Sequence, residues 1–318
     1  MTGDGILGQV GAERSAERLI RSVTGDVAAS ALGVTACHEH LVLGVAYSGV
    51  ADDTLTPDRV AGDLEAFRSL GGATIVELTN EGMGRDPLAL RGISERTGLN
   101  IICSTGFYQQ SHYPPIVGSS TEEELAEIFV RDLNDGIGDT GIRAGIIGEI
   151  GTSPGRMTTD EERVVRAAAC ASIATGAPVS MHTPLGDQAL EQVAILRSEG
   201  LDPGRVAIGH LDLRPDPDYH ERIADTGVYI QYDTFGKSNY MADDARLACI
   251  AEMVRRGYGE RILLSCDISR SHYLRRFGGW GYAHLLDKVA PALRELVGDG
   301  PLRNMLVDNP ARFLTFAP

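Results

Sequence analysis

The chain has 318 residues, of which 43% are hydrophobic and 23% charged, the composition of a globular protein with a sizeable core rather than of a disordered chain. Its formal net charge of -15 disfavours nucleic-acid binding, because such binding neutralises phosphates with Lys and Arg. The N-terminus lacks the basic start and apolar run of a signal peptide, and no stretch approaches about 18 uninterrupted apolar residues. We therefore expect a cytoplasmic protein without a membrane span.

Short apolar runs of strand length alternate with segments of helical spacing along the whole chain. The runs are 34–40, 74–78, 101–105, 144–150, 179–182, 206–210, 228–232 and 261–267. Between them, helices are predicted over 121–133, 159–174 and 243–256, the first two with acidic first turns. Eight such units predict a single-domain α/β protein, a (β/α)8 TIM barrel over 1–318 with a cap at 1–30, and an open doubly wound sheet is the alternative.

The strongest chemical signal is the end of the first run, where His38 and His40 flank Glu39. Residues two apart on a strand point to the same face, so the two imidazoles project together. Neutral imidazole is the commonest protein ligand for zinc-like metals. Taken alone, the pair could equally be two polar residues at a loop.

Other runs also end in metal-competent side chains. These are Glu149 in GIIGEIG, His182 in VSMHT, His210 in AIGHLD and Asp267 in LLSCDIS. Each one alone could be hydrogen-bonded or could cap the next helix. Six such residues from five strands, all at the edge where barrel enzymes carry their active sites, predict a metal site.

With these motifs the chain resembles the phosphotriesterase-like branch of the amidohydrolase superfamily, most closely its subgroup of phosphotriesterase homology proteins. The resemblance covers nearly the full length. It is carried by CHEHL at 37–41, TGFYQ at 105–109, GEIGTS at 148–153, SMHT at 180–183, IGHLD at 208–212, YDTFGK at 232–237 and SCDISRSHY at 265–273. The resemblance implies a two-metal centre: one ion held by His38, His40 and Asp267, the other by His182 and His210, and both bridged by Glu149 and a hydroxide.

At the position of Glu149, the better-known members of this family have a carbamylated lysine that bridges the two ions. The only lysines of the chain, Lys237 and Lys288, are far from that strand. A glutamate can serve, because each of its oxygens can bind one cation and its charge reduces the repulsion between the ions. The ligand set accepts Zn, Mn, Co or Ni, and we expect two divalent ions, zinc first.

The expected reaction is hydrolysis of an ester-type bond, with the bridging hydroxide as nucleophile and Asp267 as the catalytic group that accepts its proton. A lactone or carboxylic ester is the preferred small-molecule substrate. The alternative is a phosphotriester, and a more distant alternative is a barrel that binds metal without catalysis. A homodimer is expected.

Substrate contacts are predicted from the loops after the third, seventh and eighth runs. The resemblance suggests that Tyr108 contacts substrate, whereas a packed loop tyrosine is the alternative. Lys237, Arg270, Arg275 and Arg276 would form a pocket for an anionic substrate, or else a surface cluster paired with nearby carboxylates.

Two rival motifs point to other chemistry. The segment 151–155 matches the G-x-S-x-G pattern of serine hydrolases, but proline follows Ser153 and has no N–H for an oxyanion hole. Cys37 and Cys266 adjoin predicted ligands, but alternation should turn both to the opposite face as buried thiols.

Overall fold

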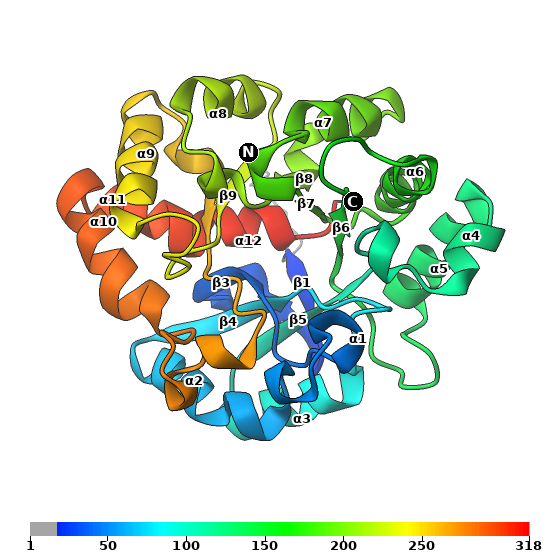
Figure 1. Cartoon of the computed structure of the whole chain (residues 1–318), viewed down its shortest axis with the longest axis horizontal. Coiled ribbons are helices and arrows are strands. Elements are labelled where there is room, and N and C mark those ends of the chain that lie inside the picture. The colour runs from blue at the N-terminus through cyan, green and yellow to red at the C-terminus, as the bar shows by residue number, and fades with distance from the viewer. Residues whose placement is uncertain (1–17, 318) are drawn as a thin grey trace, which may run out of the picture.

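Eight parallel strands pair in chain order and form a nearly closed barrel, with the helices arranged around them (Figure 1). This computed structural model describes residues 18–317. The strands are β3 (Val34–Glu39), β4 (Gly72–Glu77), β5 (Asn100–Thr105), β6 (Ile146–Gly151), β7 (Val179–His182), β8 (Val206–Ile208), β9 (Tyr229–Tyr232) and β10 (Ile262–Leu264). Each predicted run overlaps one strand. The predicted (β/α)8 barrel is confirmed, and the alternative of an open sheet is wrong.

The helices form the outer layer. They are α1 (Val45–Ser48), α2 (Pro57–Ser69), α3 (Pro87–Thr97), α4 (Pro115–Ser119), α5 (Glu122–Asn134), α6 (Thr159–Thr175), α7 (Ala189–Ser198), α8 (Pro217–Ala224), α9 (Asp243–Arg255), α10 (Ala290–Val297), α11 (Asp299–Arg303) and α12 (Asn309–Leu314). Capping boxes at Thr121 and Thr158 begin α5 and α6, because each threonine accepts from the N–H of a glutamate three residues later. Within residues 18–317, no helix is long and apolar enough to cross a membrane.

The interior of the barrel is a separate, smaller apolar cluster. Its strand members are Cys37, Val76, Ile102, Ile146, Ala207, Tyr229 and Leu263, one from each of seven strands. Side chains from so many strands can meet only inside the barrel, whereas the larger cluster packs between sheet and helices. Ile20, on the hairpin of β1 (Leu19–Ser22) and β2 (Gly25–Ala28), and Phe313 on α12 join the interior cluster and cover one end. Residues 1–17 of the predicted cap lie outside the described residues.

Cys37 corrects one prediction from strand alternation. The pairing of β3 with β4 shifts register between Ala36 and Glu39, so that Cys37 and His38 both face the interior. Both Cys37 and Cys266 are nevertheless buried and free. Burial raises the pKa of the Cys37 thiol, which opposes any role as a thiolate.

The barrel closes where β3 meets β10, and the carboxylate of Glu39 makes the junction. Glu39 Oε1 accepts from the Ser265 hydroxyl and from the Cys266 N–H, both at 2.8 Å, and Oε2 accepts from the Ile268 N–H at 2.7 Å. The Asp267 N–H donates to the carbonyl of His38 at 3.2 Å. Glu39, between the two histidines, therefore fixes the position of the segment 265–268, which carries Asp267.

Candidate metal centre

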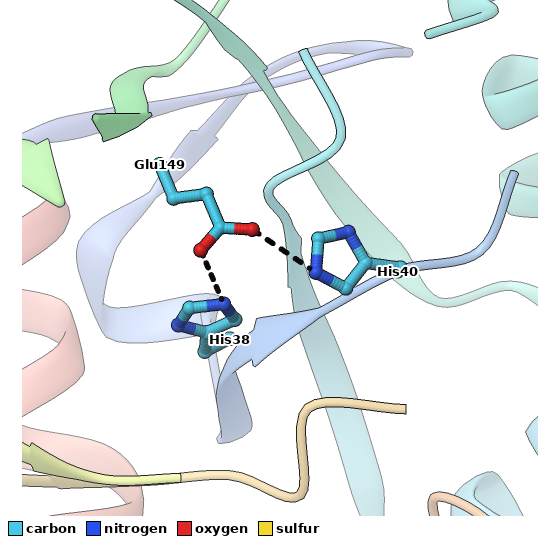
Figure 2. Close-up of side chains that lie close together, drawn as sticks. All are labelled: His38, His40 and Glu149. Atoms are coloured by element: carbon cyan, nitrogen blue, oxygen red, sulfur yellow. Dashed lines mark ion pairs between the residues drawn. The ribbon is translucent and has the colours of Figure 1, made fainter. Parts of the chain in front are cut away.

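The predicted histidine ligands surround the carboxylate of Glu149 at the C-terminal edge of the barrel; Figure 2 shows Glu149 with His38 and His40. Glu149 Oε1 lies 3.3 Å from His40 Nε2, and Oε2 lies 3.5 Å from His38 Nε2. The same Oε2 lies 3.0 Å from His182 Nδ1 and 3.8 Å from His210 Nε2. The carboxylate thus contacts both histidine pairs, as a bridging ligand would.

Asp267 completes the cluster. Its Oδ1 lies 3.3 Å from His40 Nε2 and 4.0 Å from His38 Nε2, and its Oδ2 pairs with the ammonium of Lys237. The Nε2 atoms of His38 and His40 are buried and have no hydrogen-bond partner among the described residues. When deprotonated, these nitrogens and the carboxylate oxygens beside them fit a zinc-like divalent cation.

Strict alternation would have turned two of these ligands away. Ala207 faces the interior, so His210, three residues on, should face outward, but its left-handed backbone (φ 61°) redirects the ring. Ile146 also faces the interior, and the register shift after Ile147 brings Glu149 back to the same side. Local backbone irregularity is therefore part of how the site is built.

The buried carboxylates of the cluster change the pKa values of its histidines. Burial opposes protonation of His40, but contacts with Asp267 and Glu149 raise the pKa of His40 to about 9. Burial likewise opposes protonation of His210, but the charge of Asp233 raises the pKa of His210 to about 10. In the metal-free protein these rings hold protons at neutral pH, and an incoming cation must displace them.

The nitrogens of the histidines that face away from Glu149 contact further polar groups. Thr79 Oγ1 lies 2.8 Å from His40 Nδ1, the Tyr108 hydroxyl 3.2 Å from His182 Nε2, and the Asp233 carboxylate within 3.0 Å of Nδ1 of both His38 and His210. Such contacts set which ring nitrogen carries the proton. The sequence reasoning assigned no role to Thr79 or Asp233, although each follows the end of a barrel strand, β4 and β9 respectively, and that position could have drawn attention to them.

A cavity of about 270 Å³ opens beside the cluster. It is lined by Tyr47, Tyr108, Gln109, Pro154, His182, Thr183, Pro184, Leu185, His210, Leu213, Thr234, Lys237, Tyr240, Asp267, Ser269, Arg270 and Tyr273. Of the predicted substrate contacts, Tyr108, Lys237 and Arg270 all lie in this wall. Arg270 is held by a hydrogen bond from its Nη1 to the carbonyl of Ser48 at 2.6 Å.

Arg275 does not lie in the wall of this cavity. Its guanidinium pairs with Asp287 and donates to the carbonyl of Trp280 at 3.0 Å, and its backbone N–H bonds Asp63 on α2. It lines a separate hollow that Arg276 shares. The short helical turns after β10 carry the chain outward to α2, which separates Arg275 from Arg270.

The G-x-S-x-G segment has a structural role. The Ser153 hydroxyl and N–H both donate to the carboxylate of Glu161, which also accepts from the Gln110 N–H. Glu161 is buried in the first turn of α6. Ser153 therefore joins two loops at the cavity rim instead of facing a histidine base.

Comparison with known proteins agrees with this geometry. A sequence model of the phosphotriesterase family matches residues 19–314. The crystal structure of the phosphotriesterase homology protein of Escherichia coli, complexed with phosphate in the active site, has a TM-score of 0.87 and 36% identity over 90% of this chain and 99% of that one. A lactonase of Listeria monocytogenes has a TM-score of 0.90 and 32% identity over 94% and 100% of the two chains.

A third relative, the N-acetyltaurine hydrolase of Dictyostelium discoideum, is 37% identical over 80% of this chain and 72% of its own length. These similarities extend over most of the barrel, including every strand that carries a predicted ligand. The chain belongs to the phosphotriesterase family and is a hydrolase.

Proposed function

We propose that the chain is a two-metal hydrolase that cleaves an ester-type bond at a carbonyl carbon of a small anionic substrate, with a lactone as the first choice. The observation that carries the proposal is the position of Glu149 between two histidine pairs beside an open cavity. His38, His40 and Asp267 would hold one ion and His182 and His210 the other, with Glu149 shared. Zinc is the first expectation, with Mn, Co or Ni as alternatives.

The bound cations would supply Lewis acidity and a water of lowered pKa. Asp267 would accept the proton of the attacking water at the carboxylate oxygen that faces His40. Lys237, buried and paired with the other oxygen, keeps that carboxylate oriented toward the cavity. Burial excludes bulk water from the pair and strengthens its interaction.

Two positive side chains in the cavity wall, Lys237 and Arg270, support an anionic substrate. The phosphate in the active site of the Escherichia coli relative and the lactonase activity named for the Listeria relative favour a lactone that carries an acidic group. The N-acetyltaurine hydrolase relative favours a second candidate, the amide of an acidic amine. A neutral phosphotriester would gain no attraction between opposite charges from either side chain, and it is the weaker alternative.

The test is metal analysis beside a substrate screen. Protein purified without chelators should contain about two divalent ions per chain, and chelation should abolish turnover of an acidic lactone or N-acyl amide. Arg270→Ala should raise KM for an acidic lactone by about tenfold and leave KM for a neutral lactone unchanged, because only the acidic substrate uses the guanidinium. Arg197→Ala, at an exposed arginine of α7, is the matched control. An equal rise in KM for both lactones would contradict the anionic subsite.

A cytoplasmic location and a homodimer stay predictions of the sequence.

A further inference from the structure

Asp233 is a fully buried carboxylate that directly follows β9 and touches one histidine of each proposed ion site. His210 Nδ1–H donates to Asp233 Oδ1 at 2.9 Å, and the backbone N–H of His210 donates to the same oxygen at 2.9 Å. The other oxygen, Oδ2, lies 3.0 Å from His38 Nδ1 in an ion-pair contact that is not aligned for a hydrogen bond, and neither atom has a hydrogen-bond partner among the described residues. One side chain therefore contacts both halves of the cluster on the side away from Glu149.

We propose that Asp233 is a positioning residue that couples the two ion sites. By accepting from Nδ1–H of His210 and placing its other oxygen 3.0 Å from Nδ1 of His38, it would favour the proton on Nδ1 of both rings and leave Nε2 of both for the ions. The Nε2 atoms of the two rings do approach the same oxygen of Glu149, at 3.5 and 3.8 Å. This inference rests on the proposed two-ion site.

Only a carboxylate can serve both rings. It offers an acceptor oxygen to each imidazole, whereas an amide offers one oxygen and one NH2 group. With asparagine at this position, the side-chain NH2 group would face the Nδ1–H of one ring, and two donors would oppose each other. The substitution would also remove a negative charge that attracts the two cations.

The end of β8 is shaped to admit this carboxylate. Gly209 lies beside it, and a Cβ at Gly209 would lie 3.1 Å from Asp233 Oδ2 and 2.8 Å from the carbonyl of Met181. Any larger residue would crowd the contact between Asp233 and His38. The left-handed backbone of His210 is held by its own N–H bond to Asp233, so ring and backbone share one acceptor.

The cluster offers two matched controls, each on a single ion site. Thr79 contacts His40 of one proposed site, and Tyr108 contacts His182 of the other. Thr79→Val and Tyr108→Phe each remove one hydroxyl at nearly constant volume. Each should weaken the binding of one ion only, whereas Asp233→Asn should weaken both.

The experiment measures ion affinity and not turnover. Metal-free wild type and the three variants are titrated with Zn²⁺ in competition with a chromophoric chelator, and bound zinc is counted by plasma mass spectrometry. For Asp233→Asn, both ions should bind about 10–100-fold more weakly than in wild type. Two ions in the wild type with one or both unchanged in Asp233→Asn would overturn the coupling. A wild type that binds no zinc would instead contradict the proposed function itself.

A second measurement uses only the wild type, so its result does not depend on whether a variant folds. In zinc-loaded wild type with ¹⁵N-labelled histidine, both His38 and His210 should carry their proton on Nδ1 and exchange it slowly. A ring of either residue with an unprotonated Nδ1 would overturn the proposal.

Discussion

At the scale of single residues, Asp267 combines two functions in the proposed site. Burial opposes its ionisation, but the charge of Lys237 keeps the pKa of Asp267 below its ordinary value. One oxygen faces His40 and the other pairs with Lys237, and in the proposed site the carboxylate would be both ligand and proton acceptor. Its backbone is left-handed (φ 47°), a conformation that asparagine also tolerates.

Asp267→Asn should therefore separate the two functions. The amide oxygen can still face an ion, but the side chain cannot accept a proton, so we expect kcat to fall by about 10²–10⁴-fold with bound zinc still near two per chain. Steady-state kinetics and metal analysis on the same preparation measure both quantities. Turnover near that of the wild type would remove Asp267 from its catalytic assignment.

At the scale of elements, the outer face of β9 is joined to α8 and α9 by a small polar cluster. The Tyr232 hydroxyl forms a hydrogen bond with His220 Nδ1 at 2.8 Å, and Cys249 Sγ lies 3.4 Å from the same nitrogen. Burial lowers the pKa of His220 from 6.5 to about 4, so the ring stays neutral in the folded protein at neutral pH. This contact helps fix the strand that Asp233 follows.

The shift of His220 predicts a pH-dependent stability. Between pH 6.5 and about 4 the unfolded chain binds a proton that folded His220 does not, so the free energy of unfolding should fall as pH falls through this window. The loss from this group would approach about 3 kcal/mol. His220→Gln should have a flatter profile in urea unfolding followed at several pH values. Equal slopes in the wild type and in His220→Gln would refute the assignment.

At the scale of the whole molecule, the barrel concentrates charge at one edge. The two carboxylates and four imidazoles of the proposed site lie in one cluster with the buried Asp233, in a chain whose net charge is already -15. Bound cations would offset the negative charges there and bind only the folded state, since the ligands come from strands far apart in sequence.

Removal of metal should therefore lower the stability of the entire barrel. A ligand at about 1,000 times its Kd adds about 4 kcal/mol to the free energy of unfolding. We expect the Tm measured by calorimetry to fall on dialysis against chelator and to recover when Zn²⁺ is restored. An unchanged Tm in protein that has lost two ions would show that the site does not contribute to folding.

The sequence by itself determined the barrel and most of the residues proposed as its central ligands. Periodicity locates each strand, and the carboxyl ends of eight parallel strands must meet at one edge, so that residues ending those strands are brought together whatever the loops do. The placement of His38 and His40 beside a common centre follows from that rule, whereas Glu149 also depends on the register shift in β6. The proposed division into two ion sites came from the family resemblance.

Only the tertiary structure decided what depends on contacts between loops or on local departures from alternation. The position of Arg275 against α2 follows from the course of a loop, which periodicity does not describe. The interior position of Cys37 follows from a register shift, which requires the partner strand. Asp233 touches two histidines that precede it by 195 and 23 positions, and no local pattern records such a pairing because it exists only once the barrel has closed.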